Sequence, residues 1–164
     1  MIDAHEIAPG LWMGGAPPEG SALAGAGFRF LCLCAWEHQP RVQAFPGVEV
    51  CRIDLDDDGQ MPPAWQLDEA WHLGALVARR VRRGRPALVT CWQGRNRSGL
   101  VVAMALCHLT GCAGPAAVQA VRERRRAPAG ATLTNQVFVR ALSAIAPRRR
   151  GQQTFRAALA AGLG

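Results

Sequence analysis

The sequence predicts an α/β fold, a single domain with a mostly parallel central sheet flanked by helices. Short apolar runs alternate with helical patterns along most of the chain, which is typical of parallel strands joined by helices. The 164 residues are 49% hydrophobic and 6% aromatic, which suits one domain with one core. Because no internal repeat or long linker is found, we assign residues 1–147 to this domain. The remaining basic residues, 148–164, form a tail or a short helix in this prediction.

Three strands are expected in the first third of the chain. Apolar runs at residues 7–13, 28–34 and 48–55 have the length and composition of strands. A segment of small residues separates the first two runs. The third run ends in an acidic loop, 56-DDDGQMPP-63, which we expect to lie at the carboxyl end of that strand.

A long amphipathic helix is expected over residues 63–83. Its last turn is rich in arginine, and Gly84 can cap its C-terminus. The predicted inner face consists of Leu67, Ala70, Trp71, Gly74, Val77 and Val81.

The most apolar part of the chain follows this helix. Residues 86–90 form a short run without alternation, as expected for a buried parallel strand. Residues 98–110 are apolar nearly all round, so we expect them to form a helix in the centre of the core, which Gly111 ends. Further helices are predicted from residue 115 and from about residue 134.

The stretch CWQGRNRSG, residues 91–99, joins the buried strand to the buried helix. Backbone N–H groups in such a loop point inward, and the helix N-terminus adds partial positive charge, so the loop can cradle a tetrahedral dianion. Gly94 and Gly99 let the backbone turn and approach the anion, and the planar guanidinium of Arg97 can hold two phosphate oxygens. Because the same positive field favours a thiolate, we expect Cys91 to be an activated nucleophile at the base of the cradle.

The other five cysteines are expected to be small buried hydrophobic residues in a reducing compartment. The six cysteines show no C-x-x-C pair, no metal-ligand spacing and no density typical of a secreted disulfide scaffold. Cys91 is the only one with an arginine six residues later. The alternative, a buried cysteine beside an arginine-rich surface turn, is disfavoured because Gly94, Ser98 and Gly99 also stand at the required spacing.

At these residues the chain resembles the cysteine-dependent protein tyrosine phosphatase superfamily, whose signature is C-x5-R-[S/T]. It is most similar to the compact dual-specificity group. IAPGLWMGG resembles that group's opening segment, and ERRRAPAGATLTNQVF resembles its late Arg-Pro and Asn-then-Phe stretch. The resemblance covers roughly residues 5–145. The chain has no tyrosine and is too short for the tyrosine-specific branch, whose recognition loop contains one.

The resemblance implies a phosphatase that works in two steps without a metal or cofactor. Cys91 would attack phosphorus and form a phosphocysteine, while Arg97 stabilises the equatorial oxygens. Ser98 would donate a hydrogen bond to the sulfur and ease its departure in the second step. The implied phosphate-binding loop consists of Trp92, Gln93, Gly94, Arg95, Asn96 and Arg97.

An aspartate would protonate the leaving oxygen and then activate water. In the compact members of the group this acid comes four residues after an apolar strand residue. Ile53 therefore implies Asp57, with Asp58 as the second choice. Thr90 stands where the family usually has histidine, so its hydroxyl offers one hydrogen bond and no imidazole.

Four tryptophans and three arginine clusters are expected to have structural roles or to lie at the surface. Trp36, Trp65 and Trp71 are expected in the core or in helix packing, and Trp92 either in the core or at the pocket rim. Arg95 faces the pocket mouth or is a plain surface residue. The arginine clusters at 79–85, 122–126 and 148–150 are expected on solvated helix faces.

The expected function is hydrolysis of phosphate monoesters, first of phosphotyrosine and phosphoserine/threonine proteins. Phosphoinositides, RNA 5′-phosphates and a phosphate-binding pseudophosphatase are the alternatives. A rhodanese-like sulfurtransferase also uses a loop cysteine but needs no upstream acid, so the acids at 56–58 argue against it. The net charge of +7 favours an anionic partner without choosing one, and nucleic acid is not the favoured choice.

The chain is expected in the cytoplasm. No apolar run approaches the roughly 20 residues that span a bilayer, and the N-terminus lacks the basic region of a secretory signal. The sequence indicates no oligomeric state.

Overall fold

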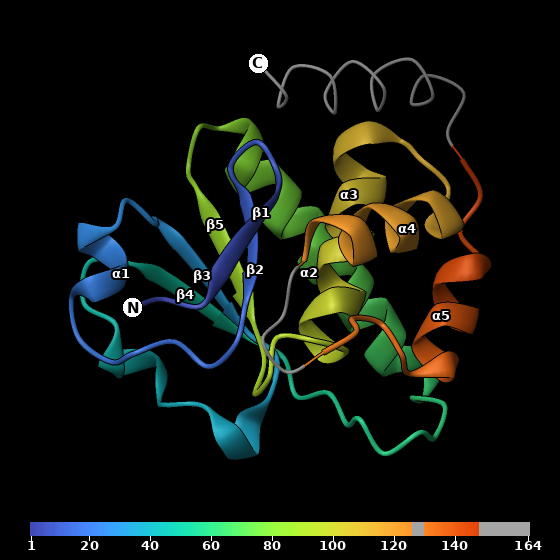
Figure 1. Ribbon diagram of the computed structural model, residues 1–164, viewed down its shortest axis with the longest axis horizontal. Coiled ribbons are helices and arrows are strands. Elements are labelled where there is room, and N and C mark those ends of the chain that lie inside the picture. The colour runs from blue at the N-terminus through green and yellow to red at the C-terminus, as the bar shows by residue number, and fades with distance from the viewer. Residues whose placement is uncertain (126–129, 148–164) are drawn as a thin grey trace.

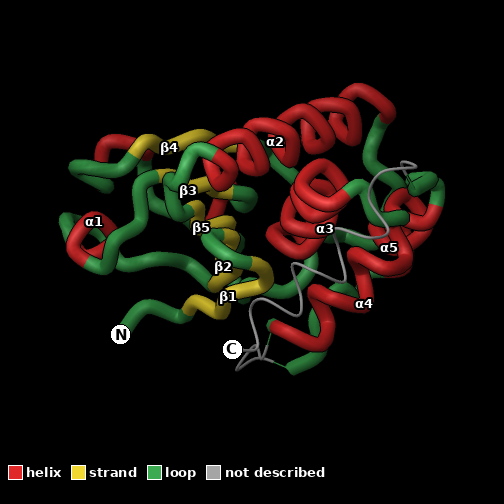
Figure 2. Tube along the Cα trace, turned by 90° about the horizontal axis from the view of Figure 1, so that it is seen from above, coloured by secondary structure: helices red, strands yellow, loops and turns green. Residues whose placement is uncertain are grey.

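The computed structural model describes residues 1–125 and 130–147. Five strands form one sheet in the order β1-β2-β5-β3-β4, with β2, β5, β3 and β4 parallel. Helices α2 to α5 lie together on one face of the sheet, and the short α1 lies on the other (Figures 1 and 2). The predicted single-domain α/β fold is confirmed. The predicted tail, residues 148–164, lies outside the described residues.

The strand that leads to Cys91 occupies the middle of the sheet. All four residues of β5 (Ala87–Thr90) are buried. It pairs in parallel with β2 (Leu11–Gly14) on one side and with β3 (Phe30–Leu33) on the other, and β4 (Glu49–Arg52) lies beyond β3. Loops that follow these strands therefore meet at one carboxyl edge, where α/β proteins commonly bind ligands.

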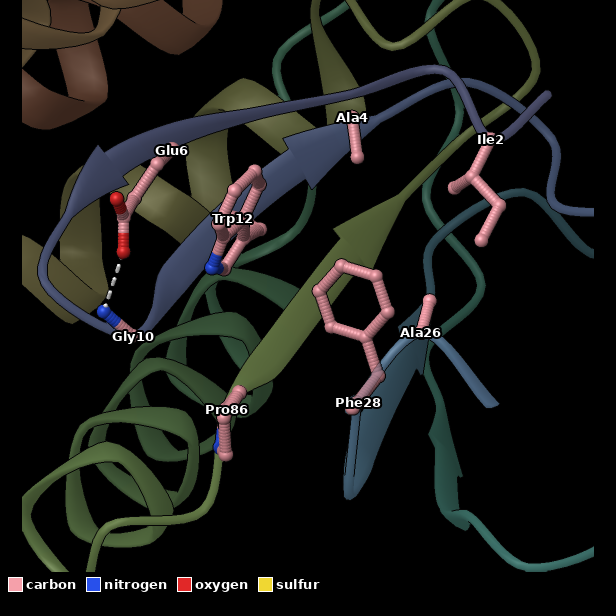
Figure 3. Close-up of a pocket in the computed structure, with 9 residues that line it drawn as sticks. Ile2, Ala4, Glu6, Gly10, Trp12, Ala26, Phe28 and Pro86 are labelled. Atoms are coloured by element: carbon pink, nitrogen blue, oxygen red, sulfur yellow. Dashed lines mark hydrogen bonds between the residues drawn. The ribbon is translucent and has the colours of Figure 1, made fainter. Parts of the chain in front are cut away.

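The prediction of one strand over residues 7–13 is wrong. The segment belongs to an antiparallel hairpin of β1 (Ala4–Ala8) and β2. Proline has no N–H to donate to a ladder, and Pro9 lies in the turn. Gly10 has a φ of +75°, and its N–H donates to the Glu6 carboxylate at 2.9 Å (Figure 3). The chain therefore reverses where the apolar run suggested a continuous strand.

The two main predicted helices are present. The first, α2 (Ala64–Arg82), is followed by Gly84, which has a φ of +69° and donates its N–H to the Val81 carbonyl at 2.9 Å. The second, α3 (Arg97–Thr110), is almost entirely buried and ends at Gly111 with a φ of +73°. Both ends use glycine in the left-handed conformation, as predicted.

The remaining elements are short. They are α1 (Ala22–Gly25) in the small-residue segment, the 3₁₀ helices η1 (Trp36–His38) and η2 (Val42–Ala44), α4 (Gly114–Arg124) and α5 (Gln136–Ser143). In the part of the chain that the structure describes, no single helix is long and apolar enough to span a membrane. By length and composition, α3 and α4 together would suffice, but a bend of 118° separates them.

The core has two parts, one on each face of the sheet. Helix α3 fills the larger part and packs closely against α2. At Gly74, an added Cβ would lie 2.9 Å from Cβ of Met104, so only glycine permits this approach. The smaller part consists of Leu23, Phe28, Leu31, Leu33, Phe45 and Leu88. Packing on both faces fixes β5 and α3, and with them the two ends of the loop between them.

Two of the three tryptophans expected in the core or in helix packing lie largely exposed at the surface instead. Trp36 is 61% exposed and Trp65 is 65% exposed. Both stand in the first turn of their helices, at the margins of the sheet, where apolar character alone does not bring burial. Trp71 packs against the core as predicted, with its ring centroid 3.9 Å from that of His108.

Candidate active site

The loop between β5 and α3 brings the predicted nucleophile and hydroxyl together. Cys91 is only 3% exposed, and its Sγ lies 3.2 Å from Oγ of the fully buried Ser98. The N–H of Cys91 donates to the Gly14 carbonyl of β2 at 3.4 Å. The thiol therefore lies at the bottom of the loop, with a hydroxyl in hydrogen-bonding contact with the sulfur.

Arg97 is buried beside this thiol. Its Nη1 donates to the Glu37 carboxylate and to the Leu55 carbonyl, the latter at 3.3 Å. Its Nε is buried and has no partner within residues 1–125 and 130–147. An unpaired buried N–H is costly, so this atom offers a place for an anion. Burial opposes the charge, but the bond to Glu37 and the charges of Cys91 and Asp57 raise the pKa of Arg97.

Glu37 is a site residue that the sequence analysis missed. It lies in η1, directly after β3, and its carboxylate holds one side of the Arg97 guanidinium. Burial is the largest single influence and favours the neutral acid, but the hydrogen bond from Arg97, a backbone hydrogen bond and the charges of Arg97 and His38 together lower the pKa of Glu37. An acidic residue just after a strand that neighbours β5 was the available signal, because such residues meet at the carboxyl edge.

Asp57 reaches the loop between β5 and α3, and Asp58 does not. Although Asp57 is exposed, its Oδ2 accepts a hydrogen bond from Nδ2 of Asn96 at 3.0 Å, and its Oδ1 accepts one from Nδ2 of Asn135 at 2.7 Å. Asp58 instead accepts from the N–H of Gln60 at 2.8 Å, a contact within its own turn. The structure thus ties the first-choice aspartate, and not the second, to the candidate site.

The side chains of Asn96 and Arg95 fasten the loop to the segment before α5. Oδ1 of Asn96 accepts from the N–H groups of Thr134 and Asn135, at 2.9 and 3.2 Å. Nε of Arg95 donates to the Ala131 carbonyl at 2.8 Å. These contacts engage both side chains in holding the loop. From the sequence, Asn96 is expected to contact the phosphate, and Arg95 to contact the phosphate, to face the pocket mouth or to be a plain surface residue.

The two glycines of the loop have different roles. Gly94 has a φ of +64°, and an added Cβ would lie 2.5 Å from the Gly14 carbonyl carbon. This position therefore needs glycine for both conformation and space. Gly99 was expected to let the backbone approach the anion. Its neighbour is instead the side chain of Leu133, which an added Cβ would meet at 2.8 Å, so Gly99 lets the segment before α5 pack closely against α3.

A buried arginine supports the loop from behind. Nε of Arg125 donates to the Gly94 carbonyl at 3.0 Å, and Nη1 and Nη2 donate to the two carboxylate oxygens of Asp3 at 2.8 and 2.6 Å. These hydrogen bonds outweigh burial and lower the pKa of Asp3. The expectation of a solvated face at 122–126 is therefore wrong for Arg125, which is 3% exposed. No local pattern reveals the contact, because its partner lies 122 residues away.

Three predicted residues complete the rim and base. Trp92 is 51% exposed, and its ring centroid lies 4.9 Å from that of His38, so it belongs to the rim. Gln93 beside it is exposed as well. Thr90 is fully buried. Its hydroxyl donates to the Cys32 carbonyl at 3.2 Å and accepts a hydrogen bond from the side-chain amide of Gln39.

No protein-family model matches the chain, and no curated protein matches it. Solved structures do match. A mouse protein described as a dual specificity phosphatase, complexed with zinc tungstate, is 26% identical over 96% of this chain and 91% of its own, with a TM-score of 0.69. Human DUSP28 is 26% identical over 86% of this chain and 93% of its own, with a TM-score of 0.68. PTPMT1 in complex with PI(5)P is similar in fold, with 18% identity over 94% of this chain and 99% of its own and a TM-score of 0.64.

Proposed function

We propose that this chain, whose predicted likeness to the dual-specificity phosphatases the solved structures confirm, hydrolyses phosphate monoesters through a cysteinyl-phosphate intermediate. The observation that carries the proposal is the buried, unpaired Nε of Arg97. It belongs to a cation at the start of the helix that follows Cys91, and Cys91 itself contacts Ser98. An N–H without a partner beside a buried thiol suits a site that an anion completes.

In the first step the Cys91 thiolate attacks phosphorus, a sulfur–phosphorus bond forms, and the ester oxygen leaves with its electron pair. Asp57 gives that oxygen a proton. Nε of Arg97 and the inward N–H groups of the loop hold the equatorial oxygens, while Nη1 stays on Glu37. The charge that develops on the phosphoryl group is thereby stabilised by donors that are already in position.

In the second step Asp57, now a carboxylate, takes a proton from water as the water attacks the phosphocysteine. The sulfur–phosphorus bond breaks, and inorganic phosphate and the thiolate are released. The hydroxyl of Ser98, 3.2 Å from Sγ, donates to the departing sulfur. The chemistry balances with residues of this chain and water alone.

We infer that the substrates are phosphotyrosine and phosphoserine/threonine proteins, with phosphoinositides or RNA 5′-phosphates as the alternative. The exposed Trp92, whose ring contacts that of His38 at an interplanar angle of 39°, supports a substrate that covers the rim. We place the protein in the cytoplasm, because all six cysteines are free thiols, which suits a reducing compartment.

The test uses 4-nitrophenyl phosphate, phosphopeptides, a phosphoinositide and a 5′-phosphorylated RNA, all with EDTA present. Cys91→Ser should abolish turnover and retain tungstate binding, measured by calorimetry. Cys51→Ser, at a half-buried cysteine of β4, is the matched control and should keep activity. Turnover by Cys91→Ser above about 1% of wild type contradicts the proposal, since loss of a nucleophile costs several orders of magnitude.

A further inference from the structure

A groove of about 520 Å³ opens beside the phosphate loop. Its walls come from η1, η2 and the end of β4, and it is lined by Trp36, Glu37, Gln39, Arg41 and Arg52, among others. Glu37 belongs to both places, because its carboxylate also binds Arg97. The groove therefore begins within one side chain's length of the cradle.

The charge of this groove is positive. Arg41 is exposed, and neither Arg41 nor Arg52 forms an ion pair within the described ranges, 1–125 and 130–147. The one acid that lines the groove, Glu37, is already paired with Arg97 and His38. Two guanidinium groups thus face the groove region without a carboxylate to neutralise them.

Within the described ranges, Arg52 has an unpaired donor as well as an unpaired charge. Its Nη2 donates to the Pro40 carbonyl, but its Nε is buried and has no partner in the part of the chain that the structure describes. The guanidinium carbon lies 4.8 Å from the ring centroid of Trp36, which is 61% exposed. This cation–π contact holds the guanidinium in place, so a phosphate that binds its terminal N–H groups need not order the side chain.

A second cavity among the described residues lacks such groups. It has a volume of about 500 Å³ and lies between the hairpin and the beginnings of β3 and β5, lined by Trp12, Phe28 and Pro86, among others (Figure 3). Its charged lining residue, Glu6, is bonded to Gly10. This cavity is apolar and lies at the amino ends of the parallel strands, away from the carboxyl edge where Cys91 lies.

We propose that the groove beside the cradle is a subsite for a second phosphate of the substrate, bound by Arg41 and Arg52. The inference rests on the proposed function, because the first phosphate occupies the cradle. Arginine binds phosphate through paired N–H groups, and the exposed face of Trp36 supports the organic group that links the two phosphates. The subsite makes the enzyme select doubly phosphorylated substrates over singly phosphorylated ones.

Two matched substrate pairs test whether the doubly phosphorylated substrate is a phosphopeptide or an inositol phosphate. One pair is a phosphotyrosine peptide with and without a neighbouring phosphothreonine. The other is myo-inositol 1-phosphate and myo-inositol 1,4-bisphosphate. The wild type should prefer the doubly phosphorylated member of one pair in kcat/KM, and the pair that shows the preference identifies the source.

Arg41→Gln tests the subsite, and Arg52→Gln is the second variant. Each should lower the ratio of kcat/KM for the doubly over the singly phosphorylated member about tenfold, which corresponds to about 1.4 kcal/mol. Arg79→Gln is the control, since it removes the same charge from an exposed position of α2 and should leave the ratio unchanged. A ratio that is the same in Arg41→Gln and in the wild type overturns the subsite.

Binding to Cys91→Ser separates this inference from the proposed function. Calorimetry should show tighter binding of the doubly phosphorylated member, with the advantage lost on adding Arg41→Gln. If the wild type turns over no phosphate ester, the proposed function fails, and the binding measurement alone decides the subsite. Equal affinity of Cys91→Ser for the singly and doubly phosphorylated members overturns the subsite.

Discussion

The side-chain amide of Gln39 donates a hydrogen bond of 2.8 Å to the hydroxyl of Thr90, the residue directly before Cys91. That hydroxyl donates in turn to the Cys32 carbonyl at 3.2 Å, and Oε1 of Gln39 accepts from the N–H of Ala35 at 2.8 Å. This chain of buried bonds joins the carboxyl ends of β3 and β5. Thr90 therefore acts as an anchor, and its single proton is already donated away from the thiol.

We expect Thr90→His to destabilise the protein, although the phosphatase superfamily that this chain resembles usually has histidine at this position. Thr90 is fully buried, so the larger ring overpacks the site, and Gln39 loses its acceptor. Overpacking and an unsatisfied amide each cost about 1–3 kcal/mol. Urea unfolding followed by tryptophan fluorescence measures the loss. Thr90→Ser keeps the hydroxyl and should lose less, and a Thr90→His variant as stable as the wild type would show that the anchor is dispensable.

The pair of Asp3 and Arg125 predicts a pH-dependent stability. Because Arg125 lowers the pKa of Asp3 below its ordinary value of 3.8, the ion pair stabilises the native state fully above that value. The stabilisation is lost as the pH falls through the still lower pKa of the folded state. Asp3→Asn should cost about 1.5–3 kcal/mol at pH 7, the usual worth of a hydrogen bond to a charged group.

Thermal unfolding of wild type and Asp3→Asn from pH 7 to pH 2 tests this prediction. The difference in Tm should stay constant down to about pH 4 and shrink below it. Asp68→Asn, at an exposed position of α2, is the control and should show no comparable difference. A difference in Tm that is as large at pH 2 as at pH 7 would mean that packing, and not the ion pair, accounts for the lower stability of Asp3→Asn.

Local patterns predicted most of the fold and the centre of the site. The apolar runs gave β5 and α3, and the spacing of Cys91, Arg97 and Ser98 located the loop between them. Proline and glycine inside the first apolar run are the local signal of the turn found there.

The supporting contacts had no such local signal. Glu37 and Arg97 are 60 residues apart, and Gln39 and Thr90 are 51 apart. Their contact depends on which loops meet at the carboxyl edge, and this depends on the strand order. Composition gives the residue types of these pairs but not their partners, so the sequence could not distinguish a buried arginine from a solvated one.

Glu37 is expected to position Arg97 for the phosphate. Its carboxylate occupies Nη1 of the guanidinium, which leaves Nε for the substrate. In Glu37→Ala the guanidinium can rotate. We therefore expect kcat/KM for 4-nitrophenyl phosphate to fall about tenfold and the Kd for inorganic phosphate to rise about tenfold. Each change corresponds to about 1.4 kcal/mol. Glu37→Gln retains an acceptor oxygen and should recover part of the loss. Tighter phosphate binding in Glu37→Ala would instead identify Glu37 as a competitor for the anion site.

The identity of the general acid gives the last prediction. Asp57 is bonded to Asn96 of the phosphate loop and to Asn135, whereas Asp58 is bonded within its own turn. Asp57→Asn should therefore lower kcat by roughly 10²–10⁴, the usual worth of general acid catalysis. The loss should be much smaller for 4-nitrophenyl phosphate than for phenyl phosphate, because nitrophenolate leaves without help from a proton.

Asp58→Asn is the matched control for this dependence on the leaving group. It removes the same charge one residue along the same loop, so long-range electrostatics change similarly while the contact to Asn96 remains. We expect Asp58→Asn to lower kcat only slightly, and by the same factor for 4-nitrophenyl phosphate and phenyl phosphate. If Asp58→Asn instead shows the larger loss on phenyl phosphate and Asp57→Asn does not, the loop must rearrange on substrate binding, and the acid is Asp58. If both variants spare phenyl phosphate, neither aspartate protonates the leaving oxygen, because a phenolate of that basicity cannot leave rapidly without a proton donor.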